Sequence, residues 1–229
     1  MLIINEKSRR GKAAAKTVIA ALKAAGITFD LRTMVASNHI ADVIRSAEAK
    51  VDCVILGGGD GTLNAALPGL LDIGLPLGII PLGTANDLAR TLQIPLDAVK
   101  ALEVIVAGNF RRIDVGEVNG FPFLNVASIG FGVDLTGALR SDTKQRWGVF
   151  AYLIAALRVL RRMRPFHVTV KIGDTVHRSK TVHLAVGNGR HYGGGMTVSE
   201  DAAIDDNRDR KSTRLNSSHL RTSRMPSSA

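Results

Sequence analysis

The chain has 229 residues, of which 45% are hydrophobic and 4% are aromatic. This composition allows one large or two small domains with a buried core, and the low aromatic share argues against a protein that binds single-stranded nucleic acid by base stacking. The net charge is +10, but half of it lies in residues 208–229. The charge on the rest of the chain is modest, and it suits an anionic ligand or lipid surface better than nucleic acid.

A single cysteine, Cys53, cannot form an internal disulfide, which fits a reducing compartment. The N-terminus shows no signal-peptide pattern. No apolar run reaches the ~20 residues that a membrane-spanning helix needs. We therefore expect a cytoplasmic protein.

Residues 1–110 alternate between strand and helix patterns. Strands are predicted at residues 2–5, 27–33, 51–56 and 75–81, and helices at 12–25, from Ser37 or Asn38 to 49, from the third strand to about 71, and at about 97–107. This spacing predicts an α/β fold, with a parallel sheet covered by helices on both faces. Polar loops at 57–62 and 83–87 follow the third and fourth strands, at the carboxyl edge where such sheets bind ligands.

Residues 111–206 have a different pattern. Strands are predicted at 111–118, 121–128, 166–172 and 175–187, with two-residue hairpin turns at 119–120 and 173–174. The sequence therefore predicts a second, mainly antiparallel domain with one helix at about 144–163. That helix ends in a basic segment, so it can lie on a membrane surface or pack its apolar face against its own sheet.

From residue 207 the chain is rich in Ser, Thr, Arg and Asn and shows no periodicity. We expect disorder over residues 207–229. Residues 209–219 resemble one reading frame of an adapter DNA used in sequencing, so we expect that the natural C-terminal sequence is absent.

The third predicted strand runs directly into Gly57-Gly58-Gly59-Asp60-Gly61-Thr62, and a helix pattern follows. Glycines let a backbone come close to a bulky group, and a helix start offers free N–H groups and a positive dipole end to an anion. A phosphate is the natural occupant, although neither the P-loop nor the dinucleotide glycine pattern is present. The alternative is a tight turn with Asp60 as the N-cap of the helix.

Several stretches together resemble the diacylglycerol kinase catalytic family and its bacterial YegS-like lipid kinases: residues 57–62, 81–87, 125–132, 146–148, 187–195 and 201–206. NAD kinases and phosphofructokinases share the glycine motif alone, whereas the combination is more specific. The resemblance covers residues 1 to about 206. It implies an α/β nucleotide-binding domain at 1–110 and a truncated, β-sandwich-like domain at 111–206. It also implies ATP- and Mg²⁺-dependent phosphorylation of a lipid hydroxyl, with a diacylglycerol-like acceptor at the membrane surface.

The resemblance and the expected helix start together assign candidate nucleotide-binding residues: Asn5, Ser8, Gly11, Thr33, Gly57, Gly58, Gly59, Asp60, Gly61, Thr62, Leu63, Asn64 and Thr84. For Thr33 the alternative is a strand-end hydroxyl that bonds to the backbone. Asp60 resembles a carboxylate of the sphingosine-kinase branch that is linked to the metal or accepts the proton of the acceptor hydroxyl, so it is the candidate catalytic residue.

Three further residues are candidates for binding the acceptor or the phosphate charge: Asp87, Asp134 and Arg146. Asp134 is assigned by resemblance, and Arg146 as a cation that neutralises phosphate. Their ordinary alternatives are a helix N-cap for Asp87, an exposed loop acid for Asp134, and a solvated side chain for Arg146.

The resemblance also implies a Mg²⁺ site with the carbonyl of Ala203 and the carboxylate of Asp206. In the family the pattern continues as Asp-Asp-Gly-x-Leu, whereas this chain has Asn207 and Arg208. Because Mg²⁺ requires near-octahedral oxygen ligands, we expect a weak site and an impaired enzyme. The histidines show no metal-ligand spacing, and His191 either faces the ligand or serves the fold.

Two other functions stay open. One is an NAD-kinase-like soluble kinase, for which we would expect a Gly-Asn-x-Gly stretch where residues 83–87 stand. The other is a non-catalytic nucleotide-binding remnant. We expect no nucleic-acid partner and a peripheral contact with the inner face of the membrane, and a homodimer is compatible with the sequence.

Overall fold

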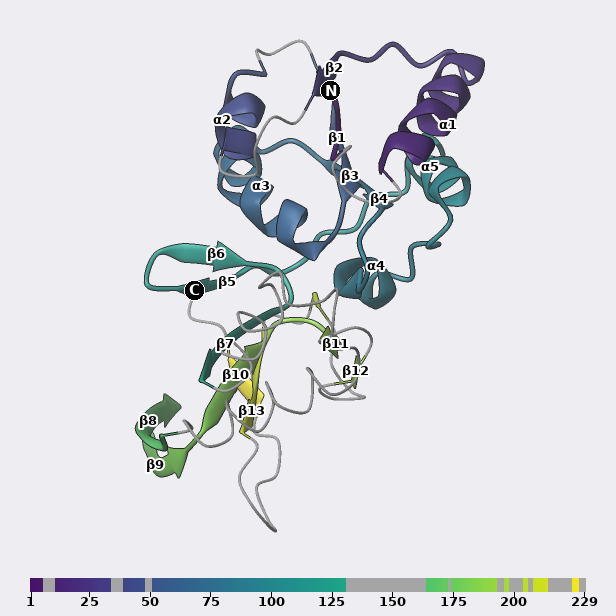
Figure 1. Ribbon diagram of the computed structural model, residues 1–229. Coiled ribbons are helices and arrows are strands. Elements are labelled where there is room, and N and C mark those ends of the chain that lie inside the picture. The colour runs from purple at the N-terminus through teal and green to yellow at the C-terminus, as the bar shows by residue number, and fades with distance from the viewer. Residues whose placement is uncertain are drawn as a thin grey trace, which may run out of the picture. The chain divides into compact units, whose positions relative to one another are not determined.

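The computed structural model describes residues 1–5, 11–33, 39–47, 51–130, 164–172, 174–192, 196–197, 204–205, 208–213 and 224–226 (Figure 1). The chain forms two compact units. The first comprises Met1–Asn125 and Asn188–Asp206, and the second comprises Val126–Gly187 and Asn207–Ala229. The first unit therefore extends beyond the expected range of 1–110 and includes a returning segment that the sequence assigns to the second domain.

The first unit is built on a four-stranded parallel sheet with the order β2-β1-β3-β4. Its strands are β1 (Leu2–Ile4), β2 (Leu31–Thr33), β3 (Val54–Gly58) and β4 (Leu77–Pro81). Every residue of β1 and β3 is buried, as expected for parallel strands with both faces covered. The predicted α/β fold is confirmed.

Helices cover the two faces of this sheet (Figure 1). Helices α1 (Gly11–Ala24) and α5 (Ala98–Val106) pack on one face, and α2 (Ile40–Arg45) and α3 (Asp60–Ile73) pack on the other. Alternation along β1 divides the core, because Leu2 and Ile4 join the α1 and α5 cluster while Ile3 joins the α2 and α3 cluster. A short helix, α4 (Asp87–Thr91), follows β4.

Helix boundaries follow local capping where the sequence supplies it. Asp97 caps α5, since its carboxylate accepts hydrogen bonds from the N–H groups of Val99 and Lys100, both at 3.0 Å. Helix α2 instead has His39 at its N-cap position, without a side-chain cap. The predicted caps at Ser37 and Asn38 are therefore wrong about where α2 begins, and both residues lie outside the described ranges.

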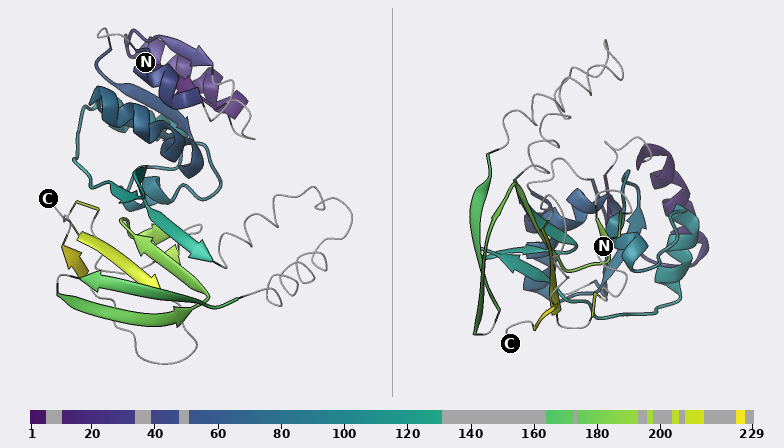
Figure 2. Two further views of the ribbon diagram at one scale, coloured as in Figure 1. Left: turned by 90° about the vertical axis from the view of Figure 1, so that its left-hand side faces the viewer. Right: turned by 90° about the horizontal axis from the view of Figure 1, so that it is seen from below.

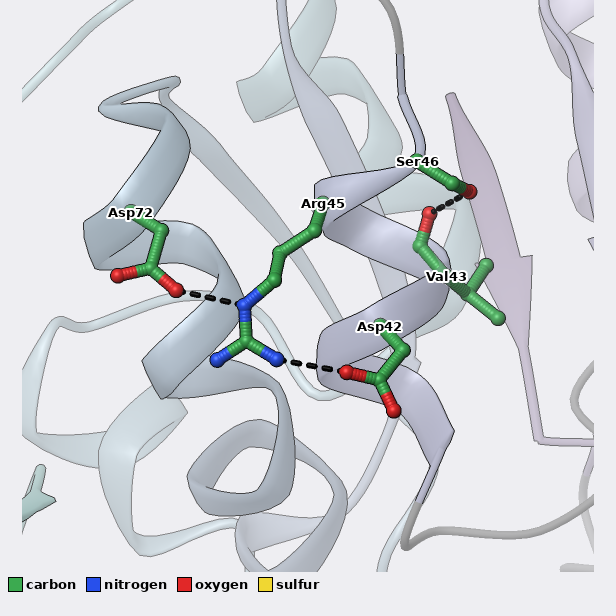
Figure 3. Close-up of polar contacts among 5 residues, drawn as sticks. All are labelled: Asp42, Val43, Arg45, Ser46 and Asp72. Atoms are coloured by element: carbon green, nitrogen blue, oxygen red, sulfur yellow. Dashed lines mark hydrogen bonds and ion pairs between the residues drawn. The ribbon is translucent and has the colours of Figure 1, made fainter.

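The outer surface of α2 and α3 carries a small ion-pair network (Figure 3). Arg45 on α2 donates to Asp72 on α3 at 2.6 Å and to Asp42, one turn earlier in its own helix, at 2.7 Å. The hydrogen bond to Asp72 is the main reason that the pKa of Arg45 is raised above its ordinary value. All three side chains are exposed, so the network adds little stability.

Buried contacts hold α2 against α3 more firmly. Gly69 lies on α3 directly against the main chain of Ala41 on α2, and a Cβ atom at Gly69 would overlap the carbonyl of Ala41. A glycine at this position lets the two helix backbones touch. Leu67 and Leu70 fill the core on either side of it.

After α5 the first unit adds a hairpin of β5 (Gly116–Val118) and β6 (Phe121–Phe123). Asn119 and Gly120 form its turn with φ values of +53° and +78°, as a type I′ turn requires. This predicted hairpin is confirmed. The returning segment adds β11 (His191–Tyr192) and β12 (Met196–Thr197), which pair with each other.

The second unit is antiparallel, as predicted. One sheet has the order β14-β13-β10-β7, with β7 (Val126–Gly130), β10 (His183–Gly187), β13 (Arg208–Thr213) and β14 (Arg224–Pro226). A hairpin of β8 (Phe166–Ile172) and β9 (Thr175–Thr181), green in Figure 2, completes the described strands. The predicted strand at 175–187 is split because the Thr181 hydroxyl bonds to both main-chain groups of His183 and bends the chain.

The expected disorder of residues 207–229 is wrong where β13 and β14 form. β13 pairs with β10 over Arg210–Thr213, because the edge of a sheet offers main-chain donors and acceptors to any extended segment, whatever its side chains. The predicted helix at 144–163 lies outside the described residues. None of the described helices is long and apolar enough to cross a membrane.

Gly69→Ala should lower the free energy of unfolding by about 1–3 kcal/mol, the usual cost of overpacking a core. The added methyl group meets main chain, which cannot turn aside, and this outweighs the better helix propensity of alanine. Urea unfolding followed by circular dichroism measures the change. Gly61→Ala is the matched control, because a Cβ there meets nothing within 4 Å, and it should leave stability unchanged or raise it. Equal stability of the two variants would contradict the close contact of α2 with α3.

Candidate functional site

The two loops predicted at the site, residues 57–62 and 83–87, follow strands that end at the carboxyl edge of the parallel sheet. The register pairs Ile4 with Thr33 and with Gly57, and Gly58 with Pro81. The ends of all four strands, and the residues that follow them, therefore lie along one edge. The N–H of Asn5 extends this ladder by donating to the carbonyl of Gly57 at 2.8 Å. This is the edge where α/β sheets bind ligands.

The glycine-rich turn changes from strand to helix within one residue. β3 ends at Gly58, Gly59 is the N-cap, and α3 begins at Asp60. The carbonyl of Gly59 accepts from the N–H groups of Thr62 at 2.9 Å and Leu63 at 3.1 Å. The N–H groups of Asp60 and Gly61 belong to the first turn, where a helix supplies no partner.

The three adjacent glycines are explained by packing within the protein. A Cβ at Gly57 would lie 3.0 Å from Leu82, one at Gly58 would lie 2.6 Å from the Thr62 side chain, and one at Gly59 would lie 2.9 Å from the Cα of Gly83. Close packing of the turn therefore accounts for these glycines without a ligand. The open direction is at Gly61, where a Cβ meets nothing within 4 Å.

A second turn, between β4 and α4, lies directly against the first. A Cβ on Gly83 would approach the Cα of Gly59 to 2.5 Å. Asn86 holds this second turn in shape, since its side chain bonds to both the N–H and the carbonyl of Gly83 at 2.9 Å. Asn86 has φ +51° and ψ +46°, a left-handed conformation in which asparagine is enriched.

The carboxylate of Asp60 connects the two turns. Oδ2 accepts from the N–H of Asp87 at 3.1 Å, and Oδ1 accepts from the N–H of Leu88 at 3.0 Å. Oδ1 also accepts from Nδ2 of Asn125 at 3.3 Å. Asp60 therefore supplies a carboxylate from α3 to the first N–H groups of α4, a favourable place for negative charge. The alternative of Asp60 as an N-cap is therefore correct in that Asp60 bonds to the start of a helix, but that helix is α4 and not its own helix α3.

Other predicted residues serve the fold through their side chains. Thr62 and Leu63 are buried, and their N–H groups already donate to the carbonyl of Gly59. Nδ2 of Asn5 lies 3.5 Å from the hydroxyl of Thr62, and Oδ1 of Asn64 accepts from the N–H of Leu124 at 3.1 Å. These contacts join β1, α3 and the end of the β5–β6 hairpin.

The remaining predicted residues differ in how far the structure places them. Gly11 is the buried first residue of α1, Thr33 is the last residue of β2, Thr84 is exposed in the second turn, and Asp87 is buried at the start of α4. Ser8, Asp134, Arg146, Ala203 and Asp206 lie outside the described residues. Within the described ranges, no three His, Cys, Asp or Glu side chains cluster in a way that could hold a metal ion.

A buried asparagine pair was missed by the sequence reasoning. Nδ2 of Asn188 donates to the carbonyls of Asp114 at 2.6 Å and Leu124 at 2.8 Å, and its N–H donates to the carbonyl of Asn125 at 2.7 Å. The signal was present, because Asn125 and Asn188 both lie in stretches that carry the family resemblance. That resemblance could have marked both residues for attention, but it did not show which groups their side chains bond to.

His191 makes hydrogen bonds within the protein, which agrees with the alternative that it serves the fold. Its Nδ1 lies 3.2 Å from the Thr91 hydroxyl, and its N–H donates to the same oxygen at 3.3 Å. These two bonds fasten β11 to the last residue of α4.

Two abutting strand-to-helix turns at the carboxyl edge of a parallel sheet define an α/β protein of the class in which ligands usually lie beyond the strand ends. Residues 1–118 match the diacylglycerol kinase catalytic domain, and residues 127–208 match the YegS C-terminal NAD kinase beta sandwich-like domain. The chain belongs to the diacylglycerol kinase catalytic domain family.

Relatives and solved structures agree with this family. The chain is 33% identical over 213 residues to the "Probable lipid kinase YegS-like" of Enterobacter sp. (strain 638), covering 90% of this chain and 71% of the relative. It is 34% identical over 167 residues to a diacylglycerol kinase of Staphylococcus saprophyticus, covering 72% of this chain and 55% of the relative. A crystal structure of a diacylglycerol kinase from Bacillus anthracis str. Sterne superimposes with a TM-score of 0.73 at 27% identity, covering 93% of this chain and 74% of that chain.

Asp60→Asn should destabilise the protein even without a ligand. The amide has the size of the carboxylate but only one acceptor oxygen, so at least one of its three donors loses its partner, at a cost of about 1–3 kcal/mol. Urea unfolding measures this loss. Asp72→Asn, which alters an exposed carboxylate, is the control and should change stability much less. An equal effect of both substitutions would contradict the role of Asp60 in joining the two turns.

Proposed function

We propose that this protein is an ATP-dependent lipid kinase that transfers the γ-phosphoryl group to the hydroxyl of a diacylglycerol-like acceptor. The observation that carries the proposal is the open start of α3 at the sheet edge, in a chain whose relatives are named lipid kinases and diacylglycerol kinases. The acceptor is met at a membrane surface.

The residues of the turn fit the phosphate chain of a nucleotide. The N–H groups of Asp60 and Gly61 point out of the first turn of α3, and the helix dipole adds partial positive charge there. Gly61 is exposed, and its missing side chain leaves room for an anion. The turn is held from behind by the Gly59–Gly83 contact, so it can bind phosphate without first being ordered.

Asp60 is placed to meet the reacting groups. A carboxylate has about four lone-pair sites, and the described donors occupy two on Oδ1 and one on Oδ2. The open site on Oδ2 can accept the proton of the lipid hydroxyl as its oxygen bonds to the γ-phosphorus and the bond to the ADP oxygen breaks. Mg²⁺ bound with the nucleotide would neutralise phosphate charge during this transfer.

The same reasoning favours weak activity in this chain. Asn207 and Arg208 stand where the family pattern has Gly and the residue after it, beside the carboxylate proposed for Mg²⁺. The second candidate, a protein that binds nucleotide without transferring phosphate, rests on this substitution.

The decisive measurement is transfer of label from radioactive ATP to lipid in vesicles that contain diacylglycerol, separated by thin-layer chromatography. We expect labelled phosphatidic acid, and about a 100-fold or greater loss in Asp60→Asn, the scale of a lost acid–base group. Asp72→Asn should retain the activity of the unaltered chain.

A parallel reaction with NAD as the acceptor tests the soluble-kinase alternative, and calorimetric titration with ATP tests binding alone. ATP binding without transfer would favour the nucleotide-binding remnant. Transfer to NAD, or the absence of ATP binding, would overturn the lipid kinase.

A further inference from the structure

The side-chain amide of Asn125 has a hydrogen-bond partner for its NH₂ group but, among the described residues, none for its oxygen. The residue is 8% exposed, and Nδ2 donates to Oδ1 of Asp60 at 3.3 Å. Its Oδ1 is buried and has no hydrogen-bond partner in the described part of the chain. Buried polar atoms are nearly always paired, so this orphaned oxygen requires a reason.

The orientation of the amide supplies that reason. Turning the side chain by 180° would bring its oxygen, instead of its NH₂ group, against the carboxylate of Asp60. Two acceptors would then face each other, so only the present orientation bonds to Asp60. The side chain of Asn125 therefore keeps its NH₂ group bonded to Asp60, and its own oxygen is left without a partner in the segments that the structure describes.

That donor decides which oxygen of Asp60 stays available. The N–H of Leu88 and Nδ2 of Asn125 fill both lone-pair sites of Oδ1, whereas the N–H of Asp87 fills one site of Oδ2. Without Asn125, each oxygen of Asp60 would accept one hydrogen bond and keep one open lone-pair site. We propose that Asn125 is a positioning residue for phosphoryl transfer, which directs Oδ2 of Asp60 toward the ligand by occupying Oδ1.

This inference rests on the proposed function, but it concerns a separate residue. The main chain of Asn125 has its own task, since its carbonyl accepts from the N–H groups of Asn188 at 2.7 Å and Gly189 at 3.1 Å. Substitution of the side chain leaves these bonds in place. The positioning role can therefore be separated from the role of residue 125 in the fold.

The experiment measures the rate of phosphoryl transfer from ATP to diacylglycerol in vesicles at pH 8 and pH 5.5, with the unaltered full chain as the reference at each pH. In Asn125→Asp a carboxylate faces the carboxylate of Asp60. The two repel at pH 8, but they share a proton at low pH, when the introduced carboxyl donates as the amide did. The titratable groups on neighbouring elements, Asp87 on α4 and His191 on β11, are common to every chain compared.

We expect Asn125→Asp to transfer phosphate about tenfold more slowly than the unaltered chain at pH 8, the effect of losing one hydrogen bond to a charged group. At pH 5.5 the difference should fall to within about twofold, since the shared proton restores the donor. Asn109→Asp, at an exposed position in the same unit, should match the unaltered chain at both values. Asn125→Ala should transfer phosphate slowly at both pH values, because it removes the donor to Asp60 and supplies no other donor at either pH.

Three outcomes would overturn the inference. Unchanged transfer rates in Asn125→Asp and Asn125→Ala would show that Asn125 positions nothing, while the proposed function stands. A loss of rate in Asn125→Asp that is the same at both pH values would assign Asn125 to the fold alone. No transfer by the unaltered chain at either pH would remove the proposed function and the inference with it.

Discussion

The carboxylate of Asp60 is the interaction on which the carboxyl edge of the sheet depends. It lies at the start of α3 but bonds to the first N–H groups of α4 and to the side chain of Asn125. One side chain thereby fixes two strand-to-helix turns and the end of the β5–β6 segment. A charged group that accepts several hydrogen bonds is costly to replace, so the shape of this edge depends on Asp60.

The glycines make that arrangement possible. Gly59 and Gly83 allow two backbones to touch, and Gly58 makes room for Thr62 beneath the turn. The protein side of each turn is therefore filled, and the side at Gly61 is open. A turn packed this tightly from behind presents its free N–H groups in a fixed direction, which is what an anion site requires.

Strand and helix periodicity was enough to predict the α/β sheet, its helical faces and the Asn119-Gly120 hairpin, because each depends on short-range patterns. The site could be predicted only to the level of which loops meet. The partners of Asp60 come from positions 87, 88 and 125, and a sequence pattern contains no information about such distant hydrogen bonds. The pairing of β13 with β10 was missed for a similar reason, since main-chain pairing depends on a free neighbouring edge more than on side-chain polarity.

The bond between Asn125 and Asn188 has a consequence for how the chain is assembled. The main chain leaves the first unit after Asn125 and re-enters it at Asn188, and these two residues are joined by a hydrogen bond of 2.7 Å. The chain therefore leaves the first unit and returns to it at neighbouring points, and the second unit is completed by residues 207–229. The spacing of these two points is held by hydrogen bonds within the first unit itself.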